Sequence, residues 1–234
     1  MAFLQDPSVL QQLQILQREF LSATWETIYA LFFQVLFAYA IGLPLGVILV
    51  TGQRDGIRPL PGWLMRLLNV LINLLRSVPF LILMIIALPL SKLIVGTKIG
   101  TEATIPPMVV AAFPLVARMV ESSLREVSGG VIEAAQSMGA STWQIVTKVM
   151  LPEAKPSLIS GGAITMTTIL GYGAMAGIIG GGGLGQMAIT YGYYNFRFIV
   201  MWVAVIALVI LVQILQSIGS RLAQSCDKRL RNRN

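Results

Sequence analysis

The chain has 234 residues, of which 56% are hydrophobic and only 12% charged, and its mean hydropathy is +0.77. Soluble domains carry about 25% charged residues, so this composition excludes an ordinary soluble domain and indicates a protein built for lipid. The net charge of +7 does not indicate nucleic-acid binding, because the excess lies in a cationic C-terminal tail that is expected to set membrane topology and to touch anionic lipid.

Apolar runs recur five times along the chain, and a membrane helix needs about 20 apolar residues. The sequence therefore predicts an all-α polytopic membrane protein, with residues 1–234 forming a single transmembrane domain. The third run is interrupted by prolines, but neighbouring helices can satisfy the carbonyls that proline frees. The predicted spans are 25–50, 70–95, 103–120, 157–179 and 198–218.

Residues 1–20 form a Gln- and Leu-rich flank before the first span. They lack the basic start, apolar core and small-residue cleavage site of a signal peptide, so no cleavable signal peptide is expected. The single cysteine, Cys226, lies in the C-terminal tail, so no internal disulfide can form.

The cations predict the orientation, because segments rich in Lys and Arg stay in the cytoplasm. This places the C-terminus inside and, two spans back, puts the 121–156 loop on the same side. With five spans the N-terminus is then outside. The tail cations are Arg221, Lys228, Arg229, Arg231 and Arg233.

The 121–156 loop has the sequence pattern of two short helices with a corner between them. Residues 131–138 can form two turns, and Gly139 is placed to end that helix in a left-handed conformation. Ser141 and Gln144 have the spacing of a capping box, so a second helix is expected to start there. Such a loop either docks onto a partner or lies on the lipid headgroups, and its spacing and polarity leave both open.

Polar residues in the second and fourth spans are candidates for a translocation pathway. Arg76 stands mid-way in an apolar run, where a charge is costly, so it is either a gate residue or a clasp to carbonyls freed by proline. The hydroxyls and glycines of the fourth span either line a path or serve close helix packing. The candidate pathway residues are Asn69, Asn73, Arg76, Ser77, Thr168, Tyr172 and Met175.

Enzyme chemistry finds little support in this sequence. There is no histidine, the aspartates lie outside the predicted spans, and no nucleophile–base arrangement or metal set is present. An ion-coupled carrier normally needs an intramembrane carboxylate, and only Glu26 and Glu102 come near, both at span ends. The run 180–185 satisfies a dinucleotide-binding pattern, but it lacks the required preceding strand in a soluble unit.

The loop reads Glu133-Ala134-Ala135, then Gly139 after three residues, and Leu151-Pro152 twelve residues beyond that glycine. This spacing resembles the EAA loop of bacterial ABC import permeases, where the membrane subunit grips its ATPase. On this resemblance the ATPase-coupling residues are Glu133, Ala134, Ala135, Gln136, Met138, Gly139, Ala140, Leu151 and Pro152.

Other blocks resemble one branch of that family, the methionine import permeases. They are the segment 73–80, which reads Asn-Leu-Leu-Arg-Ser-Val-Pro-Phe, the segment 117–121 before the loop, and Gly171-Tyr172 with the glycines of 180–185. Valine replaces the usual isoleucine at Val78 and Val149, and residues 1–20 have no counterpart that we can place. In this order the blocks are specific, although each is weak alone.

The resemblance implies a permease subunit in the bacterial cytoplasmic membrane that is not itself an enzyme. Its implied partners are two copies of an ABC ATPase that holds ATP and magnesium, an extracytoplasmic substrate-binding protein and a second copy of this chain. No cofactor or metal is expected in this chain. The implied cargo is methionine, L and D, with another small amino acid or organic solute as the alternative and an ion-coupled carrier as the alternative of another class.

Overall fold

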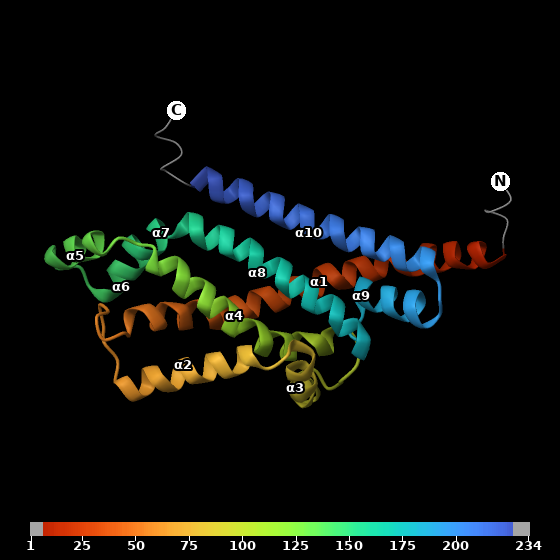
Figure 1. Ribbon diagram of the computed structural model, residues 1–234, viewed down its shortest axis with the longest axis horizontal. Helices are drawn as coiled ribbons and strands as arrows, with labels where there is room; N and C mark the ends of the chain where they lie inside the picture. The colour runs from red at the N-terminus through yellow and green to blue at the C-terminus, as the bar shows by residue number, and fades with distance from the viewer. Residues whose placement is uncertain (1–6, 227–234) are drawn as a thin grey trace. The chain divides into compact units, whose positions relative to one another are not determined.

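The computed structural model describes residues 7–226, and all regular secondary structure in that range is helical (Figure 1). Three-residue 3-10 turns at Glu102–Thr104 and Gly177–Ile179 and π-helical segments at Ile145–Met150 and Ala188–Tyr194 extend the α-helices. The α-helices are α1 Pro7–Thr51, α2 Gly62–Ser77, α3 Phe80–Ile94, α4 Ile105–Arg125, α5 Gly129–Ser137, α6 Thr142–Gln144, α7 Leu151–Glu153, α8 Lys155–Ala176, α9 Gly183–Met187 and α10 Phe198–Cys226.

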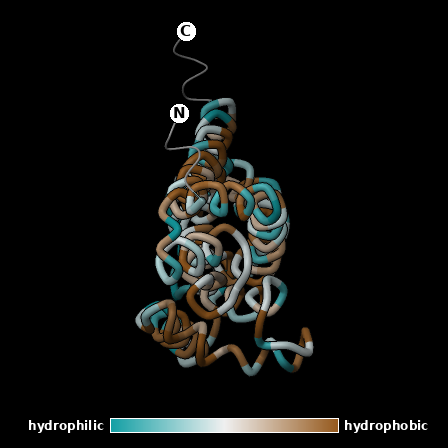
Figure 2. The backbone as a smooth tube through the Cα atoms, turned by 90° about the vertical axis from the view of Figure 1, so that its right-hand side faces the viewer, coloured by the Kyte–Doolittle hydropathy of each residue, from teal (hydrophilic) through white to brown (hydrophobic). Residues whose placement is uncertain are grey.

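Within the described residues, four helical stretches are long and apolar enough to cross a membrane, or five if the bent pair of α2 and α3 is one span. The predicted all-α membrane fold is therefore confirmed. Apolar residues follow most of the helical path, as the brown stretches of Figure 2 show. The first span starts earlier than predicted, because α1 also takes in the described part of the N-terminal flank from Pro7 onward.

The predicted second span, 70–95, is not one continuous helix. α2 already begins at Gly62. The helix is interrupted at Val78 and Pro79, which have extended φ/ψ values of −76/130° and −54/134°. Proline lacks an amide hydrogen and disfavours helical geometry in the residue before it, so helix pairing stops there. Residues 70–95 were predicted as one span because they are apolar throughout, although the Val78-Pro79 pair is itself a signal for a helix break.

The described chain divides into two compact units. Among the described residues, the first unit comprises residues 7–36, 79–111 and 167–214, and the second comprises residues 37–78, 112–166 and 215–226. The core of the first unit is built from α1, α9 and α10. Its buried members are Ala23, Leu184, Met187, Val200 and Ala204.

In the second unit, α1, α2 and α4 pack against one another. Gly42 and Gly46 let α1 approach α4 closely, since a Cβ atom added at either glycine would lie 2.6 Å from Val116 Cβ or Val120 Cβ, respectively. Small residues four apart are a common device for close packing of membrane helices. The apolar cluster beside this contact contains Leu49, Met65, Ile72 and Ala117.

Candidate functional site

The loop after α4 folds as the two-helix corner that its sequence predicts. α5 ends at Ser137, and Gly139 has a φ of +79°, the left-handed value expected of a helix-ending glycine. Its amide donates to Gln136 O at 2.9 Å, and the next amide, that of Ala140, donates to Ala135 O at 3.1 Å. The predicted corner at Gly139 is therefore confirmed.

The second helix of the loop starts with the predicted capping box. The amide of Gln144 donates to Ser141 Oγ at 3.3 Å, and the amide of Ser141 donates to Gln144 Oε1 at 2.8 Å. α6 continues through the π-helical segment Ile145–Met150 into α7. Both caps are local, so the loop keeps its shape through its own hydrogen bonds.

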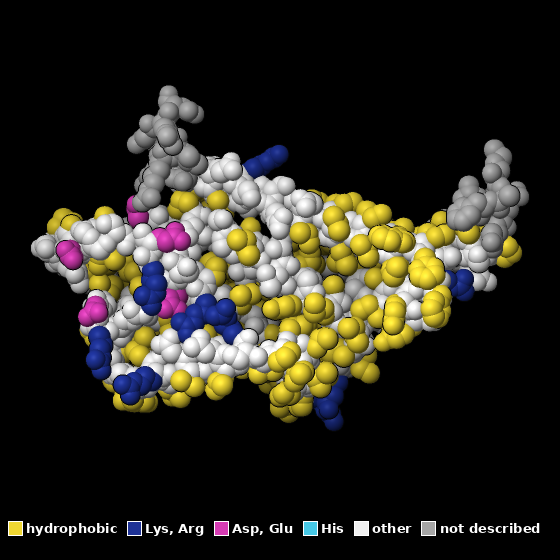
Figure 3. All heavy atoms as spheres, in the orientation of Figure 1, with side chains coloured by type: hydrophobic (Ala, Val, Ile, Leu, Met, Phe, Trp, Pro, Cys, Tyr) yellow, Lys and Arg dark blue, Asp and Glu magenta, His cyan; other side chains and the backbone are white. Residues whose placement is uncertain are grey.

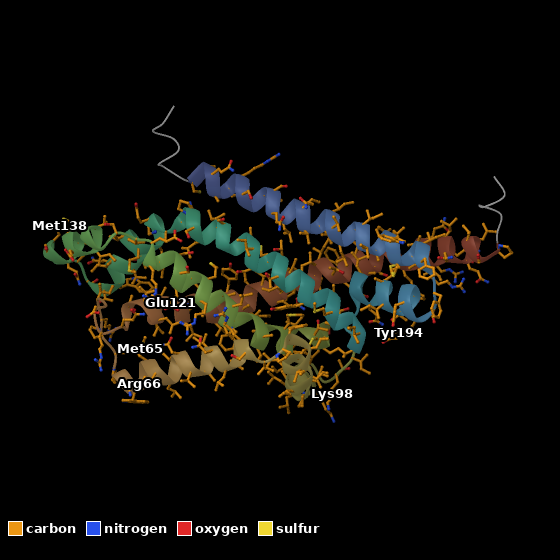
Figure 4. All side chains as sticks on the ribbon, viewed as in Figure 1. Met65, Arg66, Lys98, Glu121, Met138 and Tyr194 are labelled. Atoms are coloured by element: carbon orange, nitrogen blue, oxygen red, sulfur yellow. The ribbon has the colours of Figure 1, made fainter. Side chains whose placement is uncertain are left out.

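The loop has a buried inner face and an exposed outer face. Ala135 is only 4% exposed and packs inward together with Ile145, Val146 and Met150. Met138 and Trp143 are 80% and 74% exposed, and Figure 4 shows Met138 at the tip of the projection formed by α5 and α6. Large exposed apolar side chains in a loop indicate a contact surface.

The predicted coupling residues divide between these two faces. Ala135 lies inside the loop, so it anchors α5 and is not presented to a partner, whereas Ala140 and Leu151 are half-buried. Trp143 was not predicted to be a contact residue, because it was considered only as part of the Ser141–Gln144 capping box. The exposed members of the predicted set are Glu133, Ala134, Gln136, Met138, Gly139 and Pro152.

A polar cluster in the second unit joins α2 to α4. Arg118 Nη2 donates to Asn69 Oδ1 at 2.8 Å and to Asn73 Oδ1 at 2.9 Å, while its Nη1 donates to Glu121 Oε2 at 2.6 Å. Arg125 donates to the other carboxylate oxygen of Glu121, from Nη2 at 2.7 Å and from Nε at 3.2 Å. Glu121 is thus held by two arginines, with only 8% of its side chain exposed.

One expectation about the second predicted span and one about the third change as a result. Asn69 and Asn73 both accept hydrogen bonds from Arg118, whereas Arg76 is exposed and has no hydrogen-bond or ion-pair partner among residues 7–226. α4 also runs to Arg125, beyond the predicted span end at 120, so Glu121 is a carboxylate within a candidate span. Glu121 was not predicted as such because the predicted span ends at residue 120, five residues before the end of α4.

The remaining pathway candidates occupy separate places. Ser77 donates to Asn73 O at 2.8 Å within its own helix. In the first unit, the rings of Tyr172 and Phe80 stack with centroids 4.2 Å apart and planes 7° apart, and Met175 is exposed. Thr168, also in the first unit, has an interaction partner.

The glycine run 180–185 forms a tethered turn in the first unit. Glu26 Oε2 accepts hydrogen bonds from Gly183 N at 2.8 Å and Thr101 Oγ1 at 3.0 Å. Thr27 Oγ1 accepts one from Leu184 N at 2.9 Å. Because Glu26 is satisfied by these donors, it serves the turn, which argues against a role as a proton-carrying carboxylate.

An open hollow of about 380 Å³ adjoins this tethered turn and is lined by Glu19, Glu26, Gln186 and Tyr191, among others. Tyr191 Oη donates to Glu19 Oε1 at 2.6 Å. This hydrogen bond, together with desolvation and the charge of Glu19, raises the pKa of Tyr191 to about 12.

The loop, the helical fold and the glycine turn agree with a family match. The model of the inner membrane component of binding-protein-dependent transport systems matches residues 42–232. The chain belongs to this family. Membership confirms the resemblance seen in the loop and makes the chain a multi-pass membrane component of a transport system.

Individual members of the family are similar over most of the chain. The "probable D-methionine transport system permease protein MetI" of Vibrio cholerae is 50% identical over 210 residues, 89% of this chain and 92% of that protein. The methionine import system permease protein MetP of Bacillus subtilis is 47% identical over 158 residues, 68% of this chain and 71% of that protein.

A solved structure gives the same picture of the fold. A chain of the MetNI methionine ABC transporter, in an inward-facing conformation, matches with a TM-score of 0.86 and 42% identity, covering 89% of this chain and 96% of that one. The predicted resemblance to the methionine branch is therefore confirmed at the level of sequence and of fold.

Proposed function

We propose that this chain is the membrane-spanning subunit of an ATP-driven importer that carries methionine, as the L and D enantiomers, into the cytoplasm. The similarity to methionine permeases over nearly the whole chain supports the cargo. We call the segment between α4 and α8, residues 126–154, the coupling loop. Its exposed apolar tip supports the proposed mechanism, because a projection of this kind fits a pocket on a partner.

The proposed assembly contains two copies of this chain, two copies of an ABC ATPase on the cytoplasmic side and a substrate-binding protein on the outside. ATP and magnesium are held by the ATPase, and this chain performs transport without catalysing a reaction. The charged side chains that gather over α2, α4 and the α5–α6 projection in Figure 3 suit the cytoplasmic, cation-rich side of the second unit.

The proposed orientation has the N-terminus outside and the C-terminus in the cytoplasm. Arg221 is the described member of the cationic tail, and the other four tail cations lie outside the described residues. Exposed aromatic residues near the start of α10, including Tyr194 and Trp202, suit the opposite, outer interface of the bilayer.

ATP binding and hydrolysis would act on transport by shifting the population of two global states. A ligand shifts such an equilibrium only as far as it binds one state better than the other. The ATPase must therefore hold the coupling loop differently in its two nucleotide states. A rigid loop transmits that difference, and the caps at Ser141 and Gly139 make this one rigid.

The test is ATP-dependent uptake of labelled methionine into proteoliposomes that contain this chain with the ATPase and the binding protein encoded beside it. Competition by unlabelled L- and D-methionine, but not by leucine or histidine, is the expected result. Assembly and ATP hydrolysis without methionine uptake would keep the importer class and reject the cargo. Failure to assemble with an ATPase would reject the proposed function.

A further inference from the structure

The polar cluster around Arg118 forms the polar link between α2 and the root of the coupling loop. On the loop side, Glu121 pairs with both Arg118 and Arg125, and Arg125 is the last residue of α4. On the other side, Arg118 reaches Asn69 and Asn73 on α2. Figure 4 shows Glu121 on α4 beside α2, which also carries the labelled Met65.

Hydrogen bonds orient the members of the cluster toward Arg118. Asn69 Nδ2 donates to Met65 O at 2.8 Å, which turns its oxygen toward Arg118. One guanidinium nitrogen, Nη2, binds both asparagines, and the other, Nη1, binds Glu121. The planar guanidinium presents its donors in fixed directions from two nitrogens, whereas a lysine ammonium donates from a single point, so lysine is not an equivalent residue here.

Stability alone gives a weak reason for this cluster. Polar bonds between membrane helices contribute little on average, because the unfolded reference state also finds partners. Arg118 Nε is buried without a hydrogen-bond partner, so the described conformation leaves one of its donors unsatisfied. In some proteins, buried ionic groups that add little stability instead specify position or switch between arrangements.

We propose that Arg118 is a positioning residue that makes α2 move together with the coupling loop. α4 itself joins Arg118 to the loop, Glu121 and Arg125 on that helix orient its guanidinium, and Asn69 and Asn73 attach it to α2. The two asparagines therefore act in this clasp and do not line the pathway. The proposal rests on the proposed function, since it assigns a step in the coupling of ATP hydrolysis to transport.

The apolar contacts around the cluster do not replace it. Ile72 and Ala117 pack between α2 and α4, but apolar surfaces can slide over one another, whereas the two acceptors of Arg118 on α2, Asn69 and Asn73, define one register. Loss of the clasp should therefore leave the helices packed and the loop folded. What is lost is the transmission of a loop displacement to α2.

The test uses the complete transporter in proteoliposomes and measures both ATP hydrolysis and methionine uptake. The double variant N69A/N73A removes only the α2 side, and R118K keeps the charge but not the fork. We expect hydrolysis within about twofold of the unmodified transporter and uptake lowered about tenfold or more, so that the ATP hydrolysed per methionine rises. N73D, which offers Arg118 a carboxylate oxygen, should keep coupling near its original value.

The matched control is Arg66→Lys, an exposed cation on the same helix. It should change neither activity, and thermal unfolding of each purified variant reports on folding. Parallel losses of hydrolysis, uptake and thermal stability in N69A/N73A would show a merely structural role and overturn the proposal, as would normal coupling in both variants. An unmodified transporter that takes up no methionine would instead overturn the proposed function.

Discussion

The coupling loop and the glycine turn at 180–185 are both connections built on left-handed glycines, yet they are used in opposite ways. In the loop, Gly139 has a φ of +79° and nothing lies within 4 Å of where a Cβ would be. In the turn, Gly182 has a φ of +73°, and a Cβ there would collide with Thr101 Oγ1. The first glycine shapes an exposed projection, and the second closes a buried joint.

The difference extends to how the polar groups are satisfied. The loop supplies its own caps from Ser141 and Gln144, so its outer face stays free for a partner. The turn has one local cap, since the amide of Gly182 donates to Gln186 Oε1 at 2.6 Å, but the amides of Gly183 and Leu184 depend on the distant side chains of Glu26 and Thr27 in the first unit. Because the loop is capped by its own residues, its outer face is available to bind a partner. The turn is bonded to side chains of α1 and therefore holds parts of the first unit together.

The largest effect is expected at the turn. Gly182→Val should combine a left-handed conformation that valine resists with a collision against Thr101, at a cost of several kcal/mol. We expect the variant to be absent from membranes or to unfold far below the original temperature, as measured by the yield and thermal unfolding of purified protein. A stable, transporting variant would show that the turn is not a buried joint.

Gly139→Val makes the same chemical change where there is open space. The conformational cost is about 1–2 kcal/mol, so the protein should fold, with the corner between α5 and α6 altered. We expect normal membrane yield and methionine uptake lowered at least about tenfold, with ATP hydrolysis no longer matched to uptake. Gly139→Asn is the control, because asparagine tolerates this conformation, and normal transport by the valine variant would reject the role of the corner.

The contrast also explains how far sequence analysis could reach. A helix-ending glycine and a capping box are local sequence patterns of a few residues, so the corner at Gly139 and the box at Ser141 were predictable. The clasp of Arg118 joins residues 45 and 49 positions apart, and no periodicity shows such a pairing. The break at Pro79 was visible locally in its Val-Pro pair, but the apolar length of the run outweighed it.

The outer face of the loop allows a test of binding that does not disturb folding. Met138 and Trp143 are exposed, so replacing both with alanine should leave thermal unfolding of the isolated chain unchanged. Aromatic side chains dominate many interfaces, and we expect the affinity for the ATPase to fall about tenfold, or about 1.4 kcal/mol. Unchanged affinity in a pull-down titration would move the contact away from this tip.

The smallest effects come from single caps, and they should differ between the two connections. Ser141→Ala frees an exposed amide that water can satisfy, at a cost of about 1 kcal/mol or less. Thr27→Val leaves the amide of fully buried Leu184 without an acceptor, at a cost of about 1–3 kcal/mol.

Thermal unfolding of the two cap variants side by side measures this difference. If Thr27→Val is the less damaging change, water or another group must reach the turn, and its classification as a buried joint fails. If Ser141→Ala proves the more damaging, the loop depends on its cap for more than local shape. The expected order follows from one physical distinction, because the lost acceptor is replaced by water only where water has access.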